Sequence, residues 1–507
     1  MKSAAIIGGG LGGLAAACIL SSFGVHVRLF EKNEKVGGKL ERMKLGTYEF
    51  DYGPNTITMP ETFKNVFRIA GENPDDWLTF IKLANHTSNH FPDGSRLDFS
   101  SDRDVFASEV AKFSKKDAAN VPAFLKEVER LYVQAAAQFF QRTFTSPRAY
   151  ASPKLGRAFL SVRPFQTMNG FFRKYFKHPY VLQALNRYAT YIGSSPYDAP
   201  ATFALISHLE LNEGVFYVEN GNARIAEQLK KLAEANGAEI YTNTEVTRMH
   251  TKNKAITSLQ LKSGAEVSAD EYILNGDLLS QYPELVEEHE RPHFKNEYRD
   301  RMQASISAYV ILAGAKNTTR SLGHHQVYFS GNYEQEFHEL LQKQTYPKDP
   351  TVYVCNSRVT EPARAPEGNN LFILANAPAL KPDGKEAPGF EDYEARIYDK
   401  LESYGLSWTT DTTSTRTPAT LASRVNAYRG ALYGPAANSK QRAFFRPTNA
   451  AKDFSNLHFA GGSTHPGGGS PMVVTSGMLV ARDLLKQHRI AKVSWQQSTN
   501  RTEEDRT

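Results

Sequence analysis

The chain has 507 residues, of which 40 % are hydrophobic and 22 % are charged, a globular composition that excludes a largely disordered protein. No stretch of about 18 apolar residues runs without glycines or charge, which excludes an integral membrane protein but not one that sits on a membrane. The two cysteines, Cys18 and Cys355, are too few for a disulfide framework and indicate a reducing compartment.

The net charge of +6 hides a strong local asymmetry. Between Glu129 and Asp198 lie 68 residues that include no Asp or Glu and ten Lys or Arg. The rest of the chain therefore holds 50 basic and 54 acidic residues, a net charge of −4. The positive excess belongs to one segment, residues 130–197, and requires a local explanation.

The N-terminal 31 residues predict one βαβ unit. Residues 3–7 form a short apolar run, residues 14–23 have the composition of a helix, and residues 25–30 predict a second strand that ends at Glu31. The intervening glycines disfavour the alternative of a signal peptide. This order of elements is typical of a nucleotide-binding α/β fold.

A glycine cluster in this unit matches the pattern G-x-G-x-x-G at Gly8, Gly10 and Gly13. The first glycine allows the tight turn, the second lets a pyrophosphate approach the backbone, and the third lets the helix pack close to the strand. Glu31 stands where a carboxylate binds the ribose hydroxyls and disfavours a 2′-phosphate. The unit therefore predicts a dinucleotide site at which NADP is a poor ligand.

Further elements alternate along the rest of the chain. Residues 91–95 predict a turn between short strands, and the last periodic helix spans about 472–488. The order of the strands and helices within residues 305–445 is not predicted. The remaining expected elements are a mainly helical stretch at 102–141, a helical acid-free segment interrupted by Pro147, Pro153, Pro164 and Pro179, a helix from Gly221 to Gly237, and strands at 239–241, 245–250 and 256–261.

Three further segments carry a resemblance to a known family. Residues 32–39 contain a second glycine pair, Gly37-Gly38, followed by Lys39, and residues 50–54 have the sequence Phe-Asp-Tyr-Gly-Pro. Residues 457–472 form an apolar run, a glycine-rich loop and a helix start at Pro471. Together these segments resemble the FAD-containing amine oxidase and carotenoid desaturase superfamily.

The resemblance covers nearly the whole chain and has two departures. Arg usually follows the glycine pair in this superfamily, and Lys39 keeps the charge without the bidentate guanidinium. Many relatives carry an acid at the position of Ser463, whereas carotenoid enzymes tolerate Ser or Thr there. The strings at 91–94, 191–200, 429–434 and 466–473 are most similar to oxygenases of the terminal methyl of C30 carotenoids.

The resemblance implies FAD as the cofactor. A helix that begins near Pro471 can stabilise negative charge on the reduced flavin. No catalytic residue and no metal ligand is assigned. The predicted cofactor-binding residues are Gly8, Gly10, Gly12, Gly13, Glu31, Lys32, Gly38, Lys39, Gly53, Pro54, Val246, Gly462, Ser463, Pro471 and Met472.

The implied fold is α/β, with a Rossmann-like FAD-binding domain of the amine-oxidase type, an inserted mixed-sheet substrate domain and a helical lobe that faces a membrane. The FAD-binding domain is discontinuous. Its predicted parts are residues 1–75, 215–290 and 445–490, the substrate domain takes 76–214 (with the helical lobe) and 291–444, and 491–507 form a frayed tail.

Three functions stay open at this stage. The first is oxidation of the terminal methyl of a C30 carotenoid, diaponeurosporene or diapolycopene, to an aldehyde. The second is desaturation of dehydrosqualene or phytoene, which shares the loss of a hydride from an allylic carbon. The third is a non-enzymatic lipid carrier on the same fold. The electron acceptor, the oxygen source and the oligomeric state are not predicted.

The acid-free segment, residues 130–197, also holds fifteen Phe or Tyr, among them Phe159, Phe165, Phe171, Phe172, Tyr175 and Phe176. Cations interleaved with aromatics suit a surface that binds anionic lipid, and a carotenoid must be collected from lipid. The alternatives are a helical subdomain with an aromatic core and, less favoured, a nucleic-acid surface. The expected location is therefore the cytoplasm, at the inner face of the cell membrane.

The histidines give weaker predictions. His86 and His90 have the i, i+4 spacing of helical metal ligands, but a strand and turn follow, so a metal is disfavoured. His324 and His325 are expected to be solvated. His465 lies in the loop placed near the flavin, where it orients substrate, relays a proton or caps the loop. Neither cysteine stands in a C-x-x-C motif, which disfavours thiol catalysis.

Overall fold

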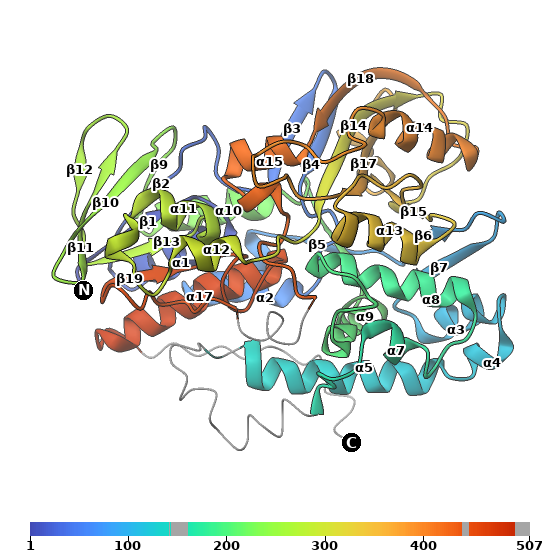
Figure 1. Cartoon of the computed structure of the whole chain (residues 1–507), viewed down its shortest axis with the longest axis horizontal. Helices are drawn as coiled ribbons and strands as arrows, with labels where there is room; N and C mark the ends of the chain where they lie inside the picture. Colours follow the sequence, from blue (N-terminus) through green and yellow to red (C-terminus); the bar gives the residue numbers. More distant parts are fainter. Residues whose placement is uncertain (141, 143–160, 439–445, 492–507) are drawn as a thin grey trace.

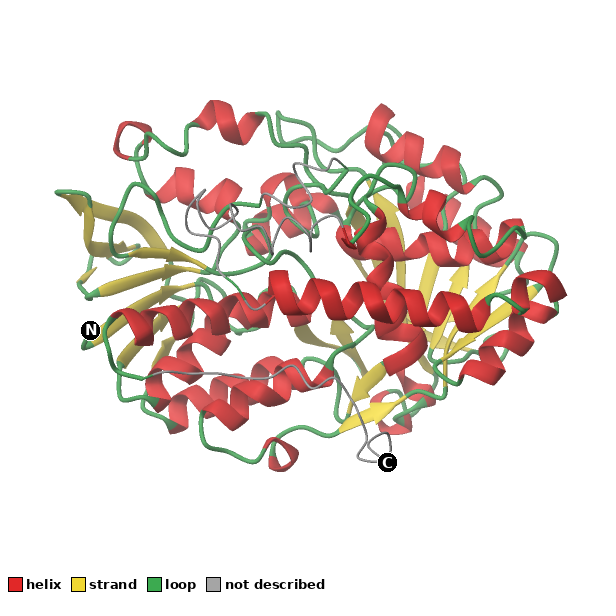
Figure 2. Ribbon diagram, turned by 90° about the horizontal axis from the view of Figure 1, so that it is seen from below, coloured by secondary structure: helices red, strands yellow, loops and turns green. Residues whose placement is uncertain are grey.

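The computed structural model describes residues 1–140, 142, 161–438 and 446–491. Two sheets lie at opposite ends of the molecule, with helices between them and along one side (Figures 1 and 2). A parallel sheet belongs to the first end and a larger mixed sheet to the second. The helical lobe packs beneath the mixed sheet in Figure 1.

The parallel sheet has the strand order β19-β13-β1-β2-β9, so the N-terminal strand is central. Residues 4–6 of that strand are completely buried because strands flank it and helices cover it. The predicted strands at 3–7, 25–30 and 239–241 are confirmed. The five strands are β1 (Ser3–Ile7), β2 (His26–Phe30), β9 (Glu239–Tyr241), β13 (Glu271–Leu274) and β19 (Leu457–Phe459).

Helix α1 (Leu11–Ser22) fills the space between the sheet and the helices α10 (Arg224–Ala235) and α17 (Ser470–Gln487). It begins three residues before the predicted start, because Gly10 has extended backbone and already caps the helix. A Cβ on Gly477 would lie 2.0 Å from the Gly12 carbonyl, so glycines permit the close crossing of α1 and α17. The helix α2 (Pro60–Ile69) packs against both.

A small antiparallel sheet extends from this end of the molecule. It consists of β10 (Val246–Lys252), β11 (Ala255–Leu261) and β12 (Glu266–Val267), and confirms the strands predicted at 245–250 and 256–261. The helices α11 (Leu278–Leu285) and α12 (Asn296–Asp300) follow β13. The predicted helix after Gly221 is confirmed as α10, with Ile225, Leu229 and Leu232 buried on one face.

The mixed sheet has the order β18-β14-β17-β16-β15-β6-β7, and only β15 and β6 pair in parallel. The turn predicted at 91–95 joins β6 and β7, as expected. Its strands are β6 (Asn85–His90), β7 (Arg96–Ser100), β14 (Ser307–Lys316), β15 (His325–Tyr328), β16 (Val352–Asn356), β17 (Asn369–Ala377) and β18 (Thr409–Arg416).

Shorter elements surround the mixed sheet. Two separate two-stranded antiparallel sheets pair β3 with β4, which form a hairpin, and β5 with β8, which are distant in sequence. These elements are β3 (Glu41–Leu45), β4 (Tyr48–Tyr52), β5 (Phe80–Lys82), β8 (Phe216–Val218), α13 (Tyr333–Phe337), α14 (Tyr393–Ser403) and α15 (Pro418–Val425).

The lobe is helical, as predicted, and its helices are α3 (Arg103–Ala111), α4 (Lys115–Ala118), α5 (Val121–Ala135), α7 (Met168–Phe172), α8 (Pro179–Asn186) and α9 (Ile206–His208). Pro179 starts α8 instead of interrupting a helix, because proline is accommodated in a first helical turn. Pro147, Pro153 and Phe159 lie outside the described residues. The predicted tail, residues 491–507, also lies outside the described residues, except for residue 491.

The aromatics of the acid-free segment mostly form the core of the lobe. Phe171, Phe172 and Phe176 are fully buried and pack around Phe124 of α5, whereas Phe165 is 64 % exposed. The expectation that these aromatics sit at a lipid interface is therefore wrong for the buried ones, since the lobe needs them as its core. Among the described residues no helix is long and apolar enough to cross a bilayer.

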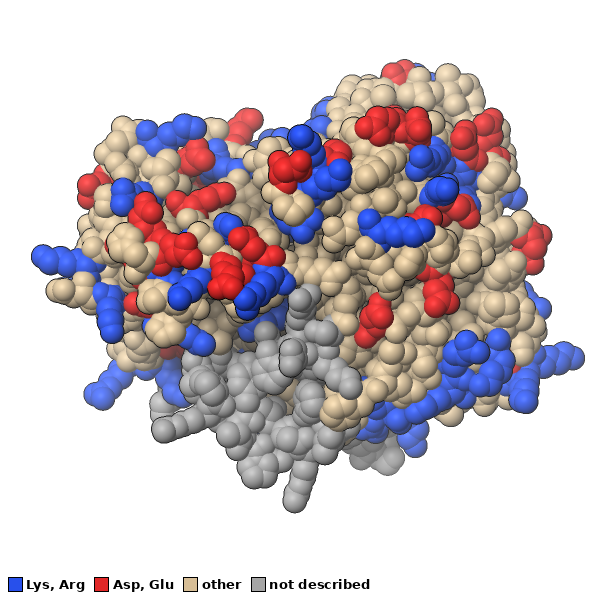
Figure 3. All heavy atoms as spheres, viewed as in Figure 1, with Lys and Arg blue, Asp and Glu red and all other residues tan. Residues whose placement is uncertain are grey.

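Several cations of the same segment face outward, whereas Arg187 is buried. Arg173, Lys174 and Lys177 are exposed, and the Asp117 carboxylate accepts hydrogen bonds from the backbone N–H groups of Lys177 and His178, which fixes this loop against α4. Figure 3 shows Lys and Arg gathered over this part of the lobe. We call the exposed residues Lys112, Lys115, Lys116, Arg173, Lys174 and Lys177 the basic patch.

Candidate functional site: a cavity between the two sheets

One cavity of about 700 Å³ lies between the parallel-sheet end and the mixed sheet with its lobe. Its first wall contains the turn after β1, the end of β2, the segments 37–40 and 52–56, and the loop 461–470. Its second wall contains side chains from the lobe and the inner strands of the mixed sheet. The two walls differ in chemistry and are described in turn.

The glycine turn after β1 is shaped by close backbone approaches. A Cβ on Gly13 would lie 2.4 Å from the Gly8 carbonyl, and one on Gly10 would lie 2.9 Å from Asn275 Nδ2. Gly8 and Gly10 line the cavity in front of the α1 N-terminus, where free N–H groups and the helix dipole favour a phosphate. Gly12 and Gly13 do not line it and instead pack α1 against its neighbours.

Glu31 lies at the end of β2, buried and on the cavity wall. Its carboxylate accepts hydrogen bonds from Gly9 N (2.8 Å), Asn33 N (2.9 Å) and Asn33 Nδ2 (2.7 Å). A carboxylate has about four acceptor positions, so capacity remains for a ligand hydroxyl. Lys32 and Val246 line the same end of the cavity. The carboxylate is thus held by its surroundings in the position that the sequence predicted.

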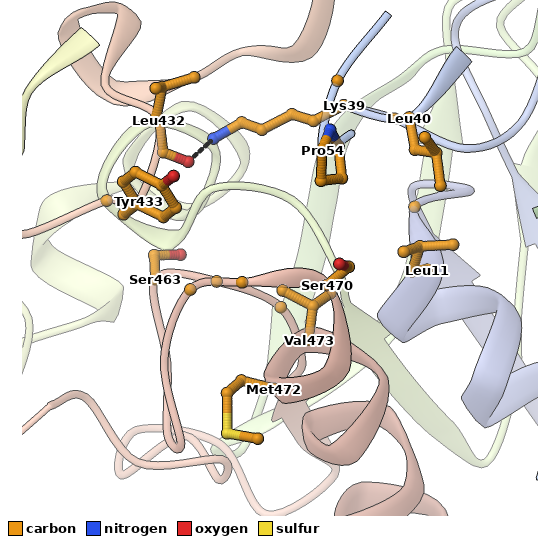
Figure 4. A pocket seen from close by; sticks show the side chains of 18 of the residues that line it. Leu11, Lys39, Leu40, Pro54, Leu432, Tyr433, Ser463, Ser470, Met472 and Val473 are labelled. Carbon is orange, nitrogen blue, oxygen red and sulfur yellow. Dashed lines mark hydrogen bonds between the residues drawn. The ribbon is translucent and has the colours of Figure 1, made fainter. Parts of the chain in front are cut away.

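Lys39 crosses from the first wall to the second. Its ammonium donates to the carbonyl oxygens of Ala431 (3.1 Å) and Leu432 (2.6 Å) (Figure 4). Burial lowers the pKa of Lys39, and Asp277 opposes the shift; burial likewise raises the pKa of Asp277, against the effect of Lys39. A lysine therefore replaces the usual arginine here by holding backbone carbonyls of the opposite wall.

The segments that carried the resemblance meet at the cavity. A Cβ on Gly53 would lie 2.0 Å from the Lys39 carbonyl, so the 53–54 and 37–39 segments touch. The Ser463 hydroxyl accepts a hydrogen bond from Leu278 N (2.8 Å) and joins the C-terminal loop to α11. Helix α17 begins at Ser470 with its N-terminus at the cavity (Figure 4). Of the fifteen residues predicted to bind the cofactor, thirteen line the cavity, and Gly12 and Gly13 are the exceptions.

His465 lies in the glycine-rich loop, and its Nε2 is 2.9 Å from the Phe139 carbonyl oxygen. Burial lowers the pKa of His465 to about 4, so the ring is neutral near pH 7. This contact favours the alternative in which His465 caps the loop, because it joins the loop to Phe139, just beyond the end of helix α5.

Four other histidines considered in the sequence lie in or beside the mixed sheet. His86 and His90 lie on strand β6, where alternate side chains point to opposite faces and i, i+4 spacing does not form a helical ligand pair. The prediction that His324 and His325 are solvated is wrong, because β15 is an inner strand and both are buried. They lie near Cys355, with ligand-type atoms within 4.8 Å of one another, and their Nδ1 atoms contact Thr360 Oγ1 (2.6 Å) and Tyr353 OH (2.8 Å).

The second wall was not predicted at the level of residues. It is mainly apolar and aromatic, with a buried arginine, Arg187, and a half-buried one, Arg446. Burial lowers the pKa of Arg446 to about 10, and its guanidinium donates to backbone carbonyls at 3.3 to 3.5 Å. Prominent members of this wall are Thr190, Tyr191, Ile192, Phe203, Leu209, Val327, Tyr333, Tyr353, Phe372, Leu374 and Tyr433. No local motif marks them, since distant segments are brought together by the topology.

This fold and first wall define a dinucleotide-binding flavoprotein. The glycine turn, the carboxylate after β2, the second glycine pair and the helix start at Ser470 all face one cavity. Residues 11–485 match the flavin containing amine oxidoreductase family.

Individual relatives cover almost the full chain. The 4,4'-diaponeurosporene oxygenase of Staphylococcus haemolyticus (strain JCSC1435) is 31 % identical over 497 residues, which are 95 % of this chain and 96 % of the relative. The 4,4'-diapolycopene oxygenase of a Methylomonas species is 32 % identical and covers 94 % and 96 %. A solved oxidoreductase from Methanosarcina mazei has the same fold, with a TM-score of 0.63 at 16 % identity and coverage of 94 % and 99 %.

The chain therefore belongs to the flavin containing amine oxidoreductase family. It is a flavin-dependent oxidoreductase, as the resemblance implied, and this disfavours the alternative of a non-enzymatic lipid carrier.

Proposed function

We propose that the enzyme oxidises the terminal methyl of a C30 carotenoid to an aldehyde, with FAD as its flavin. The observation that carries the proposal is the single cavity, in which a nucleotide-type wall faces an apolar and aromatic wall. The names of the relatives agree with this substrate class. Three of the strings that resemble the C30 oxygenases, 191–200, 429–434 and 466–473, also contribute residues to the cavity.

The first wall suits FAD. Glu31 would hold the adenosine ribose, the α1 N-terminus with Gly8 and Gly10 would hold the pyrophosphate, and the α17 N-terminus would face the ring system. Residues 53–54 and Lys39 line the same cavity. When bound, the flavin supplies a hydride acceptor.

The second wall suits a long hydrocarbon. Phe203, Phe372 and Leu374 offer apolar surface that excludes water and holds a conjugated chain without polar contacts. Conjugation spreads the positive charge that hydride loss leaves on an allylic carbon, and each 1.36 kcal/mol of such stabilisation gives a tenfold rate. A C30 chain with long conjugation is therefore the expected substrate, and dehydrosqualene, whose conjugation is short and remote from the terminal methyl, is expected to react poorly.

We also propose that the basic patch binds the inner face of the cell membrane. Its six cations are exposed on the lobe, which contributes to the cavity wall. Anionic head groups attract such cations, and the carotenoid is dissolved in the same lipid. The enzyme then collects its substrate without a spanning helix.

Product masses test the proposal. The enzyme is supplied with diaponeurosporene and dehydrosqualene separately, and products are followed by mass spectrometry. Gain of oxygen with loss of two hydrogens from diaponeurosporene supports aldehyde formation. Loss of hydrogen from dehydrosqualene, with no oxygen gained from either substrate, overturns it in favour of carotenoid desaturation.

A further inference from the structure

A polar cluster is embedded in the otherwise apolar second wall. The Tyr191 hydroxyl donates to Glu210, whose side chain is fully buried. Arg187 Nη2 lies 3.7 Å from Glu210 Oε2. The guanidinium of Arg187 also lies over the rings of Tyr188 and Tyr191, at 5.8 and 5.5 Å from their centres.

The cluster is open to the cavity on one side only. Tyr191 and Arg187 line the cavity, whereas Glu210 lies behind them. Thr56 also lines the cavity and lies close to both Tyr191 and Tyr353. It follows Pro54 by two residues, so the cluster reaches the first wall at the 53–54 segment. We call Thr56, Arg187, Tyr191, Glu210 and Tyr353 the polar cluster.

Burying this cluster is expected to destabilise the fold, so a purely structural role explains it poorly. Glu210 Oε2, Arg187 Nε and the Tyr188 hydroxyl are buried without a hydrogen-bond partner, although native proteins satisfy most buried polar groups. A buried carboxylate that is incompletely paired destabilises the fold by several kcal/mol. Perturbed groups of this kind next to a cavity are typical of functional sites.

Electrostatics make Glu210 able to exchange a proton. Burial raises the pKa of Glu210, and Arg187, Tyr191 and Tyr188 oppose the shift. The other titratable neighbour is His86, whose Nδ1 lies 3.9 Å from Glu210. Burial lowers the pKa of His86 to about 3, so it stays neutral near pH 7.

We propose that Thr56, Tyr191 and Tyr353 bind the hydroxyl of a polyene that ends in a primary allylic alcohol, and that Glu210 accepts its proton through Tyr191. The alcohol carbon loses a hydride to the flavin and is oxidised. The hydroxyl proton passes to the Tyr191 oxygen while the Tyr191 proton passes to Glu210. The C–H and O–H bonds break, the C=O double bond forms, and Glu210 ends as a carboxylic acid.

This inference rests on the proposed function and adds a residue-level prediction to it. Loss of a hydride from a hydrocarbon methyl requires no acceptor for a hydroxyl proton. Conversion of the alcohol to the aldehyde requires one. Removal of the acceptor is therefore expected to slow the alcohol step selectively, by a factor of about 10² to 10⁴ for a positioned base.

The kinetic test uses the flavin-loaded enzyme with diaponeurosporene and with its terminal alcohol. Tyr191→Phe and Glu210→Gln are compared with wild type and with Tyr175→Phe, which alters a lobe tyrosine that packs on Phe124 and does not line the cavity. We expect at least a 100-fold loss with the alcohol in both cluster variants, and less than threefold with the hydrocarbon or in Tyr175→Phe. The wild-type rate with the alcohol is expected to rise with pH as Glu210 ionises, and Glu210→Gln removes that rise.

A second measurement is independent of turnover. The terminal aldehyde of diaponeurosporene is bound to the enzyme, and its visible absorption band is recorded. A hydrogen bond to the carbonyl shifts the band to longer wavelength, and we expect Tyr191→Phe to lose this shift while Tyr175→Phe keeps it. If Glu210→Gln fails to fold, Tyr191→Phe carries both tests.

The outcomes separate this inference from the proposed function. Equal slowing of the hydrocarbon and the alcohol in Tyr191→Phe indicates a structural role and overturns the inference. The same holds if the variants oxidise the alcohol at the wild-type rate. A wild type that oxidises neither compound contradicts the proposed function, and the inference is then decided by the absorption shift: an equal shift in wild type and Tyr191→Phe overturns it.

Discussion

The two walls of the cavity are built in different ways. The first wall consists largely of backbone, and its shape depends on glycines at which a Cβ would meet another main chain, as at Gly13 and Gly53. The second wall consists of side chains from the lobe, the mixed sheet and the segment 432–434. A wall of backbone is specified by short motifs, whereas a wall of side chains depends on the whole topology. Four experiments challenge this contrast, in decreasing order of expected effect.

A buried ion pair joins the two ends of the molecule. Arg364 Nη1 lies 3.1 Å from Asp51 Oδ2, both side chains are at most 3 % exposed, and Asp51 also accepts a hydrogen bond from Ala223 N (3.0 Å). Arg364→Leu leaves the carboxylate unpaired, so we expect unfolding free energy to fall by about 3–5 kcal/mol in denaturant titrations. Arg301→Leu is the control, because its pair with Glu297 is largely exposed and its loss costs below about 1 kcal/mol. If the two variants lose similar unfolding free energy, the Arg364–Asp51 pair does not stabilise the contact between the two ends.

The mixed-sheet end holds a carboxyl that makes stability depend on pH. Burial raises the pKa of Glu336 to about 7, against hydrogen bonds from Thr351 and Ser330. Below the ordinary pKa of 4.5 both folded and unfolded states are protonated. As the pH rises from 4.5 to about 7, only the unfolded state releases the proton, so stability falls by roughly 3 kcal/mol and then levels off. Glu336→Gln should remove this decline, whereas Glu334→Gln at an exposed neighbour should keep it. A decline that persists in Glu336→Gln belongs to another group.

The basic patch tests the membrane proposal. Replacing Arg173, Lys174 and Lys177 with Gln should weaken binding to anionic vesicles by about 1 kcal/mol for each cation that reaches the head groups, and added salt should weaken the wild type in the same direction. The matched control replaces Lys252, Lys254 and Lys262, exposed cations of the small sheet at the opposite end of the molecule. Cosedimentation with vesicles measures both. Equal loss in the two triple variants would mean that net charge, and not the patch, binds the lipid.

Glu31 tests the first wall. Glu31→Ala should reduce flavin retention, because a hydrogen bond to a charged group contributes about 1.5–3 kcal/mol. The flavin-to-protein absorbance ratio after gel filtration measures the effect. Glu34→Ala, an exposed acid three residues away, should retain the flavin. Normal flavin content in Glu31→Ala would remove this residue from the ribose site.

The sequence predicted the first wall well, because each of its motifs combines a turn, a strand end and a helix start within a few residues. The residues of the second wall could not be predicted from the sequence. Tyr191, Glu210 and Tyr353 meet only after the lobe and the mixed sheet have packed. The aromatics of the lobe show the same limit. Composition alone does not distinguish Phe165, which is exposed, from Phe171, which is buried. Their environments depend on α5, which lies outside the acid-free pattern over most of its length.

Strand β19 has a consequence for synthesis on the ribosome. The central strand β1 pairs with β2 early in the chain, but β13 obtains its outer neighbour only at Leu457–Phe459, and α17 covers α1 later still. Domains generally fold as units during translation, at about 5–20 residues per second. The βαβ unit of β1, α1 and β2 is synthesised more than four hundred residues before its last partners, β19 and α17. The face of α1 that α17 covers therefore stays exposed after β9, α10 and β13 have been made, and the nucleotide pocket is completed only by the segment from β19 to α17.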